Sequence, residues 1–218
     1  WYVGGHRDNF PQVITSKYPI ENVERIVGEE PDSVVTHGAG WARIVKNGRT
    51  VNIVTLHLWP QAYAYRATDV AASKAEHGGD RYRRMEIEYI CRHTIGTAPR
   101  AAEELWVMLG DNNSWSRLDN WFYKCPEDDP RLLTQDYVLE HTPYVDVIAR
   151  QHPGRFQTTT HSEKRIDFVY CTPVLYDCVT RAEVVRDDYT EPVRDPGKLS
   201  NFYHPSDHRP ILVDFDMK

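Results

Sequence analysis

The chain has 218 residues, enough for one domain with a substantial buried core, and its 40% hydrophobic and 27% charged content is that of an ordinary globular protein. The formal net charge of −6 argues against a surface that coats nucleic acid, although it is compatible with a local basic groove. The longest apolar stretches have the length of strands, so none is expected to span a bilayer.

The first predicted element is a hairpin within residues 34–58. Trp41–Lys46 and Thr50–Leu56 are strand-like runs. Between them stands Asn47-Gly48, the dipeptide that tight hairpin turns prefer. A polar, aromatic-rich connection is expected to follow this hairpin.

Two helices are expected next. Thr68 is expected to cap a short helix that stops at Gly78-Gly79. Asp80 is expected to cap a second helix, whose apolar face has helical spacing through Ile87, Ile90, Cys91 and Thr94.

The second half of the chain predicts mainly strands, with the motifs at strand ends. Residues 104–110 form a continuous apolar run that ends at a glycine, which predicts a strand buried on both faces. The further expected elements are a loop over 114–135, a helix from Thr142-Pro143 to Pro153-Gly154, an antiparallel pair of 165–172 with 174–185, and a final strand over 210–216. Residues 1–218 therefore predict one α/β domain of layered sheets and helices.

The four cysteines do not predict a disulfide scaffold or a zinc site, because they are few, scattered and without a CxxC pair. Buried free thiols are the favoured interpretation. A bridge between Cys171 and Cys178 is the alternative, if a tight turn joins two adjacent strands. The redox compartment stays open.

The first two candidate site segments follow strands. His57 ends the run after Thr55, and its imidazole can either donate to a phosphate oxygen or serve as a core histidine bonded to a backbone carbonyl. In Gly110-Asp111-Asn112-Asn113 the glycine allows a sharp turn, Asp111 can hold Mg²⁺ or orient a water, and Asn113 can bond a phosphate oxygen. The alternative for this segment is an Asx-turn.

The last two candidate segments pair a carboxylate with a histidine. Asp167 lies inside an apolar strand, where it is costly unless paired, either with a nearby arginine or with a histidine that it orients. His208, in Ser206-Asp207-His208 just before a strand, is the natural partner as base or acid. Asp207 is a candidate metal or outer ligand, and a capped turn is the alternative for this segment.

Together, these segments resemble the motifs of the endonuclease/exonuclease/phosphatase superfamily, which has the deoxyribonuclease I-like fold. In the family's order, the matching segments are the "LSRYPI" strand at Val13–Ile20, the His motif at Thr55–Leu58, the GDxN motif at Gly110–Asn113, the RIDY motif at Arg165–Phe168 and the SDH motif at Ser206–Pro210. The match runs through nearly the whole chain.

The resemblance implies a four-layer α/β/β/α sandwich of two mixed sheets, with one Mg²⁺ site (or Mn²⁺ in its place) where water attacks phosphorus in line. It implies that Asp111 orients or activates the water and that Asn113 and His57 hold phosphate oxygens. Asp207 and Asp111 would lie at the metal, and Asp167 would polarise His208, which bonds the phosphate.

The chain departs from the family pattern before its "LSRYPI" strand. The family normally has about a quarter of its fold there, including an Asn at the end of the first strand and a metal-binding Glu on a later one. Neither motif is found in this sequence. The expectation is therefore that this domain is N-terminally truncated relative to the family, and that activity requires the segment to be supplied.

The resemblance implies a phosphoester substrate in a nucleic acid, a phospholipid or a sugar or inositol phosphate. Candidate substrate-binding residues flank the site in sequence: Tyr65, Arg66 and Trp115 could stack on a base, sugar or headgroup. For most of these aromatics, packing within the loops is the favoured interpretation. The acidic balance weakly favours a small or specific phosphoester over long duplex DNA.

Two other hypotheses stand beside the phosphoester hydrolase. One is a catalytically impaired member of the fold that acts as a binding protein, which gains weight from the missing carboxylate. The other is a zinc hydrolase using His57, Asp111 and His208, which lacks any typical zinc-ligand pair.

Overall fold

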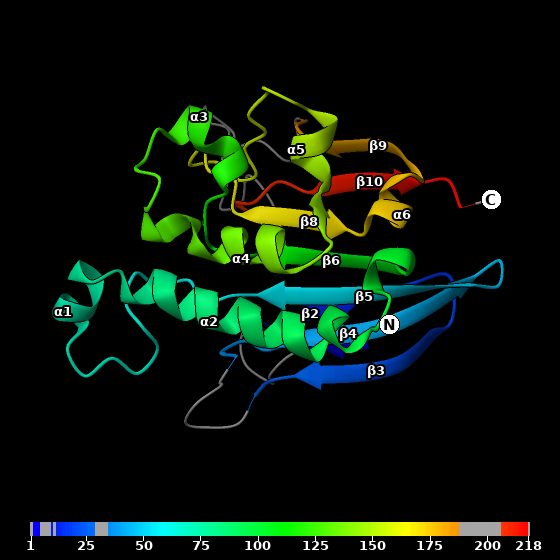
Figure 1. The fold of residues 1–218 in the computed structure, drawn as a ribbon, viewed down its shortest axis with the longest axis horizontal. Coiled ribbons are helices and arrows are strands. Elements are labelled where there is room, and N and C mark those ends of the chain that lie inside the picture. The colour runs from blue at the N-terminus through cyan, green and yellow to red at the C-terminus, as the bar shows by residue number, and fades with distance from the viewer. Residues whose placement is uncertain (1, 5–9, 11, 29–34, 188–205, 218) are drawn as a thin grey trace, which may run out of the picture.

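A six-stranded mixed sheet forms the centre of the structure, a computed structural model that describes all residues except 1, 5–9, 11, 29–34, 188–205 and 218 (Figure 1). The strands are β1 (Tyr2–Gly4), β2 (Gln12–Ile14), β3 (Ile20–Ile26), β4 (Ala39–Lys46), β5 (Arg49–His57), β6 (Leu105–Asp111), β7 (Val145–Asp146), β8 (Asp167–Cys171), β9 (Val179–Val184) and β10 (Ile211–Phe215). The α-helices are α1 (Val70–Ala75), α2 (Gly78–His93), α3 (Asn120–Tyr123), α4 (Leu133–His141), α5 (Val147–Gln151) and α6 (Pro173–Tyr176). Short 3₁₀ turns lie at Ile95–Thr97, Ala101–Glu103, Arg117–Asp119 and Pro130–Leu132.

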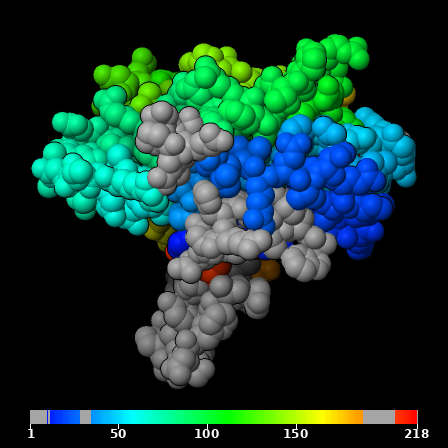
Figure 2. Space-filling model, turned by 90° about the horizontal axis from the view of Figure 1, so that it is seen from below, coloured from blue at the N-terminus to red at the C-terminus, as the bar shows by residue number. Residues whose placement is uncertain are grey.

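The sheet has the strand order β3-β4-β5-β6-β8-β7, and only the β5–β6 pair is parallel. Two antiparallel strand pairs, β1-β2 and β9-β10, are separate from it. Figure 1 shows α2 and α4 in front of the sheet and β2 behind it. In the space-filling view of Figure 2, seen from below, the cyan and green part of the chain lies above the blue N-terminal part, and a few red atoms near the C-terminus lie below it. The layered α/β sandwich expected from the sequence is confirmed.

The alternation of side chains along β6 explains how the two faces are covered. Trp106 and Met108 pack with residues of α2 and α4, whereas Leu105 and Val107 pack with the β9-β10 side of the molecule. Successive side chains on a strand point to opposite faces, so an uninterrupted apolar run is what a strand covered on both sides requires. The expectation for residues 104–110 is confirmed.

An apolar groove of about 400 Å³ lies behind the sheet, between the two strand pairs. Val13 and Ile14 of β2 line one part of it and Ile211 and Val213 of β10 another, while side chains of β5, β6 and β8 contribute the rest. Among the described residues, β2 pairs only with β1, and β10 pairs only with β9. The groove therefore adjoins two strand pairs that do not join each other.

The hairpin prediction is confirmed in detail. Asn47 and Gly48 both have positive φ, 53° and 73°, as the tight turn between β4 and β5 requires. The two helices are also present, but with different bounds: α1 ends at Ala75 rather than at Gly78-Gly79, and these two glycines begin α2. Asp69 rather than Thr68 caps α1, accepting a hydrogen bond from the amide of Ala72. Asp80 lies inside α2 and pairs with Arg83 instead of capping the helix.

Three predictions about the second half are wrong. The loop expected over 114–135 contains α3 and the start of α4, and the helix expected from Thr142 begins only at Val147, because Thr142 ends α4 and a short strand intervenes. The expected pairing of 165–172 with 174–185 is also wrong. β8 pairs with β6 and β7, whereas β9 pairs with β10, because α6 carries the chain from one layer to the other.

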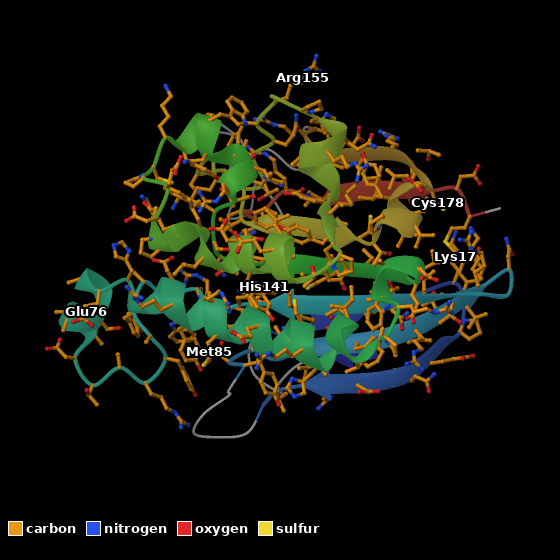
Figure 3. The ribbon with its side chains drawn as sticks, viewed as in Figure 1. Lys17, Glu76, Met85, His141, Arg155 and Cys178 are labelled. Carbon is orange, nitrogen blue, oxygen red and sulfur yellow. The ribbon has the colours of Figure 1, made fainter. Side chains whose placement is uncertain are left out.

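All four cysteines are free thiols, as the favoured interpretation held. Cys91 and Cys171 are buried. Figure 3 places Cys178 beside α6, at the end of the sheet away from the arrowhead of β5. None of the described helices has the length and apolar character needed to cross a bilayer.

Candidate active site

Three predicted site residues lie in one row across the end of the sheet. In the strand register, His57 of β5 is the neighbour of Asp111 of β6, and Asp111 is the neighbour of Asp167 of β8. Adjacent strands are about 4.8 Å apart, and residues in register point to the same side of a sheet. Side chains from segments more than fifty residues apart in sequence are thereby brought together.

Gly110 allows this row to form. Its φ of +146° is rare for residues with a side chain, and a Cβ there would lie 1.9 Å from the carbonyl oxygen of Leu56. The sequence suggested a turn after the strand, but Gly110 lies within β6 and is needed for close contact with β5. That contact sets Asp111 beside His57, with 3.6 Å between Oδ2 and Nε2.

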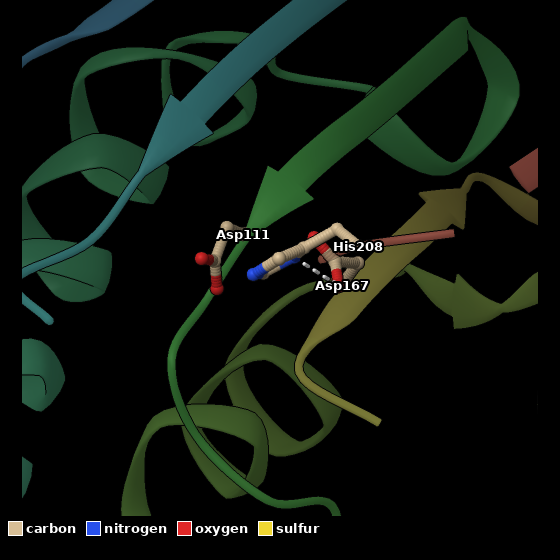
Figure 4. Close-up of side chains that lie close together, drawn as sticks. All are labelled: Asp111, Asp167 and His208. Carbon is tan, nitrogen blue, oxygen red and sulfur yellow. Dashed lines mark hydrogen bonds and ion pairs between the residues drawn. The ribbon is translucent and has the colours of Figure 1, made fainter. Parts of the chain in front are cut away.

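His208 is bonded to Asp167, as the sequence predicted. Its Nδ1 lies 2.9 and 3.0 Å from the two carboxylate oxygens. Figure 4 shows the imidazole between the carboxylates of Asp111 and Asp167. The hydrogen bond to Asp167 raises the pKa of His208 to about 9 against the opposing effect of burial, and the charge of Asp111 contributes further. His208 is therefore a cation at neutral pH in the metal-free protein.

The surroundings of Asp111 disfavour the charged form of its carboxyl group. Burial, followed by the negative charge of Asp167, raises the pKa of Asp111 to about 7. The amide of Asn113, 2.8 Å from Oδ1, and the cationic His208 act against this rise. Asp111 is consequently a carboxylate that would gain from a nearby positive charge.

Asn113 forms the Asx-turn that was the alternative interpretation of its segment. Its backbone has a φ of 48°, and its amide N–H bonds to Asp111. The side-chain Nδ2 donates to the carbonyl of Leu58, one residue after His57, at 3.1 Å. The turn therefore orients Asp111 and ties the ends of β5 and β6 together.

The residues that could hold a metal are Asp111, Asp167 and His208, whose ligand atoms all lie within 4.8 Å of one another. Two carboxylates are hard oxygen ligands of the kind that Mg²⁺ prefers. Asp207 does not belong to this group among the described residues. It is exposed, and its backbone carbonyl accepts a hydrogen bond from His161.

The candidate substrate-binding residues are placed in aromatic clusters outside this row. Trp115 stacks on Tyr123 with ring centroids 4.2 Å apart, and the guanidinium of Arg131 lies 3.9 Å from the Trp115 ring centroid. Exposed Arg66 lies over the ring of Tyr65. Packing within the loops accounts for the contacts of Trp115.

Sequence reasoning missed a buried ion network under the site. Arg165, 1% exposed, bonds to Asp119 through Nε at 2.6 Å and to Asp146 through Nη1 at 2.8 Å. The sequence offered an arginine as an alternative partner for Asp167, but Arg165 pairs with these two carboxylates instead. A charged residue beginning an apolar strand was the available indication, whereas nothing local marked Asp119 or Asp146.

A second unpredicted group holds the chain that follows His57. Glu86 of α2 is fully buried and accepts hydrogen bonds from the amides of Thr36 and Trp59, both at 2.8 Å. Burial raises the pKa of Glu86 against these bonds. Arg83, one helical turn earlier, donates to the carbonyl of Trp59. Helix α2 thus fixes the chain just after the end of β5.

No protein-family model and no curated protein sequence matches this chain. Solved structures do match it. An AP endonuclease from Archaeoglobus fulgidus is 19% identical with a TM-score of 0.60, and the match covers 93% of this chain and 73% of that one. The 3′ phosphatase NExo from Neisseria, bound to a product DNA hairpin, is 18% identical with a TM-score of 0.58 and the same coverage.

A third match carries a family name. An endonuclease/exonuclease/phosphatase family protein from Bacteroides thetaiotaomicron is 16% identical with a TM-score of 0.51, covering 83% of this chain and 56% of that one. At these identities the likeness concerns the fold. It is a likeness over almost the whole of this chain.

Proposed function

From the deoxyribonuclease I-like fold of the endonuclease/exonuclease/phosphatase superfamily, which this chain has, we propose that it hydrolyses phosphoester bonds by in-line attack of water with the help of a divalent metal ion. The observation that carries the proposal is the row of His57, Asp111 and Asp167 with His208 bonded at its end. Such a row combines a base for water, a cation for phosphate and an orienting carboxylate.

Each residue has a role that follows from its surroundings. Ionised Asp111 accepts a proton from the attacking water as the bond from the water oxygen to phosphorus forms and the bond to the leaving oxygen breaks. His57 and Asn113 donate hydrogen bonds to phosphate oxygens. Asp167 keeps His208 protonated, so that it binds a phosphate oxygen as a cation and takes part in proton transfer.

The residues fit a hard divalent cation, which we propose to be Mg²⁺, with Mn²⁺ able to replace it. Asp111 is the main carboxylate that the described site offers, because Asp167 already accepts from His208. The raised pKa of Asp111 reflects repulsion and burial that a cation would offset. Asp207, next to His208, is the proposed second ligand. The bound ion would withdraw charge from the phosphate.

One or two carboxylates with waters suffice for Mg²⁺ in many enzymes, so Asp111 with water molecules would meet that requirement.

Among phosphoesters we propose nucleic acid as the substrate. The similar structures include an AP endonuclease and a phosphatase bound to a DNA product, which favours this class over phospholipids and sugar phosphates. The net charge of −6 then confines the nucleic acid to the site region rather than the whole surface.

The test is hydrolysis of bis(p-nitrophenyl) phosphate and of a 3′-phosphorylated DNA hairpin, with Mg²⁺, with Mn²⁺ and with EDTA. Wild type is compared with His208→Ala and with His93→Ala, a matched control in which an exposed histidine of α2 is lost. We expect metal-dependent turnover that His208→Ala reduces at least a hundredfold and His93→Ala leaves intact. Turnover that is insensitive to EDTA and to His208→Ala refutes the proposal, and DNA binding without turnover favours the binding-protein alternative.

A further inference from the structure

One loop, residues 158–164, contacts both partners of the Asp167–His208 pair through its buried beginning. Its threonines Thr158, Thr159 and Thr160 are all buried, and Thr159 is fully so. On one side the loop bonds to the start of β8, and on the other side it bonds to the segment that carries His208.

On the β8 side, the contact is made by one side-chain oxygen. Thr159 Oγ1 accepts hydrogen bonds from the amides of Ile166 and Asp167, at 3.1 and 3.2 Å. The two amides at the start of β8 thereby have a hydrogen-bond acceptor, and these bonds fix the position of the Asp167 backbone relative to the loop. Buried amides without such a partner are costly.

On the other side, the same residue uses its backbone. The amide of Arg209 donates to the carbonyl of Thr159 at 2.7 Å, Thr160 and His208 form an antiparallel bridge, and the amide of His161 donates to Asp207 at 3.0 Å. The guanidinium of Arg209 also bonds to the carbonyl of Thr160. The chain on both sides of His208 is therefore tied to this loop.

We infer that Thr159 is a positioning residue for the Asp167–His208 pair, setting the distance between a carboxylate at a strand start and a histidine 41 residues later. The inference deepens the proposed function, on which its catalytic part rests. The Thr159 side chain accepts its hydrogen bonds from backbone amides, so it acts on the pair through the backbone of Asp167. Misplacement of a catalytic group by about 1 Å can reduce rates about a hundredfold, so loss of the hydrogen bonds of Thr159 should affect catalysis.

The test compares Thr159→Val, which keeps the shape and removes the acceptor, with Thr159→Ser, which keeps the acceptor. Thr134→Val is the matched control, because Thr134 is a buried threonine of α4 whose hydroxyl makes no hydrogen bond with described residues. If Thr159→Val does not fold, Thr159→Cys replaces it, since a thiol is a weak acceptor of similar size.

The first readout does not need activity. In the metal-free protein, the Nδ1–H proton of His208 bonded to Asp167 should give a slowly exchanging, downfield NMR resonance. We expect Thr159→Val to shift or broaden it, Thr159→Ser to restore it, and Thr134→Val to leave it unchanged. An unaltered resonance in folded Thr159→Val or Thr159→Cys overturns the inference, whether or not the protein proves to be a hydrolase.

The second readout is kinetic, measured well below the melting temperature of each variant. We expect Thr159→Val to lower kcat about tenfold to a hundredfold with KM changed less than about threefold, and Thr159→Ser to recover most of this loss. Equal losses in Thr159→Val and Thr134→Val would indicate a general packing effect and overturn the positioning role. If wild type is inactive while the NMR result is as expected, the proposed function is refuted, whereas the role of Thr159 in positioning the Asp167–His208 pair is supported.

Discussion

Replacing Asp167 by asparagine is expected to lower the pKa of His208 and to remove a pH-dependent contribution to stability. The perturbation keeps the side-chain shape but removes the charge that faces Nδ1 at 2.9 Å. It therefore isolates the electrostatic part of the interaction.

The magnitude follows from the pKa of His208, which rises from 6.5 to about 9 in the folded protein. One pKa unit corresponds to about 1.4 kcal/mol, so the interactions that keep His208 charged contribute at most about 3 kcal/mol. The His208 side chain is 30% exposed and that of Asp167 17%, so solvent screening reduces the value. Because the folded pKa lies above the unfolded one, this stability is complete below pH 6.5 and is lost as pH rises through about 9.

The assay combines an NMR titration of the His208 ring protons with urea unfolding of the metal-free protein at pH 6 and pH 10. The free energy of unfolding should be about 2 kcal/mol larger for wild type than for Asp167→Asn at pH 6. The difference between the two proteins should be smaller at pH 10. Asp128→Asn, which removes an exposed carboxylate, is the control. A His208 pKa that stays near 9 in Asp167→Asn would refute the reasoning and assign the shift to other carboxylates.

The other predictions concern residues around the row. Because the pKa of Asp111 rises from 3.8 to about 7, metal-free wild type should lose stability as pH climbs between these values, and melting curves of Asp111→Asn that show the same pH dependence would contradict this. Arg165→Met leaves two buried carboxylates without their cation and should cost about 3–5 kcal/mol in urea unfolding; a loss no larger than that of exposed Arg181→Met would argue against the network. Gly110→Ala should lower the melting temperature far more than Gly154→Ala, since both glycines have positive φ but only Gly110 lacks space for a Cβ. Equal effects would show that backbone strain alone decides.

The failed predictions in the fold share a physical origin. The runs at 165–172 and 174–185 both have strand character, and their nearness in sequence suggested a hairpin. The four residues of α6 change the direction of the chain, so that β8 pairs with β6 and β9 pairs with β10. Which strands pair depends on burial in the assembled layers, and local patterns carry little information about it.

The helix misplaced at Thr142 has a related explanation. Thr142-Pro143 has the composition of a helix start, but Thr142 instead bonds back to the carbonyl of Val138 at the end of α4. Asp146 caps the helix that does form, and its carboxylate also receives the guanidinium of Arg165. A long-range ion pair thus helped to decide where α5 begins.

Local sequence patterns were enough to predict the four polar segments, the hairpin turn at Asn47-Gly48 and the buried strand that carries Asp111, because each depends on neighbours a few residues away. The sequence also indicated that Asp167 and His208 would be partners, because a carboxylate inside an apolar strand needs a partner, and the resemblance to a family implied the same. The packing of the strands places His57, Asp111 and Asp167 in one register, and packing also brings Thr159 to the strand that carries Asp167 and gives Arg165 its carboxylate partners. Those contacts join residues far apart in the chain, and they form only when the layers pack, so no local pattern could encode their geometry.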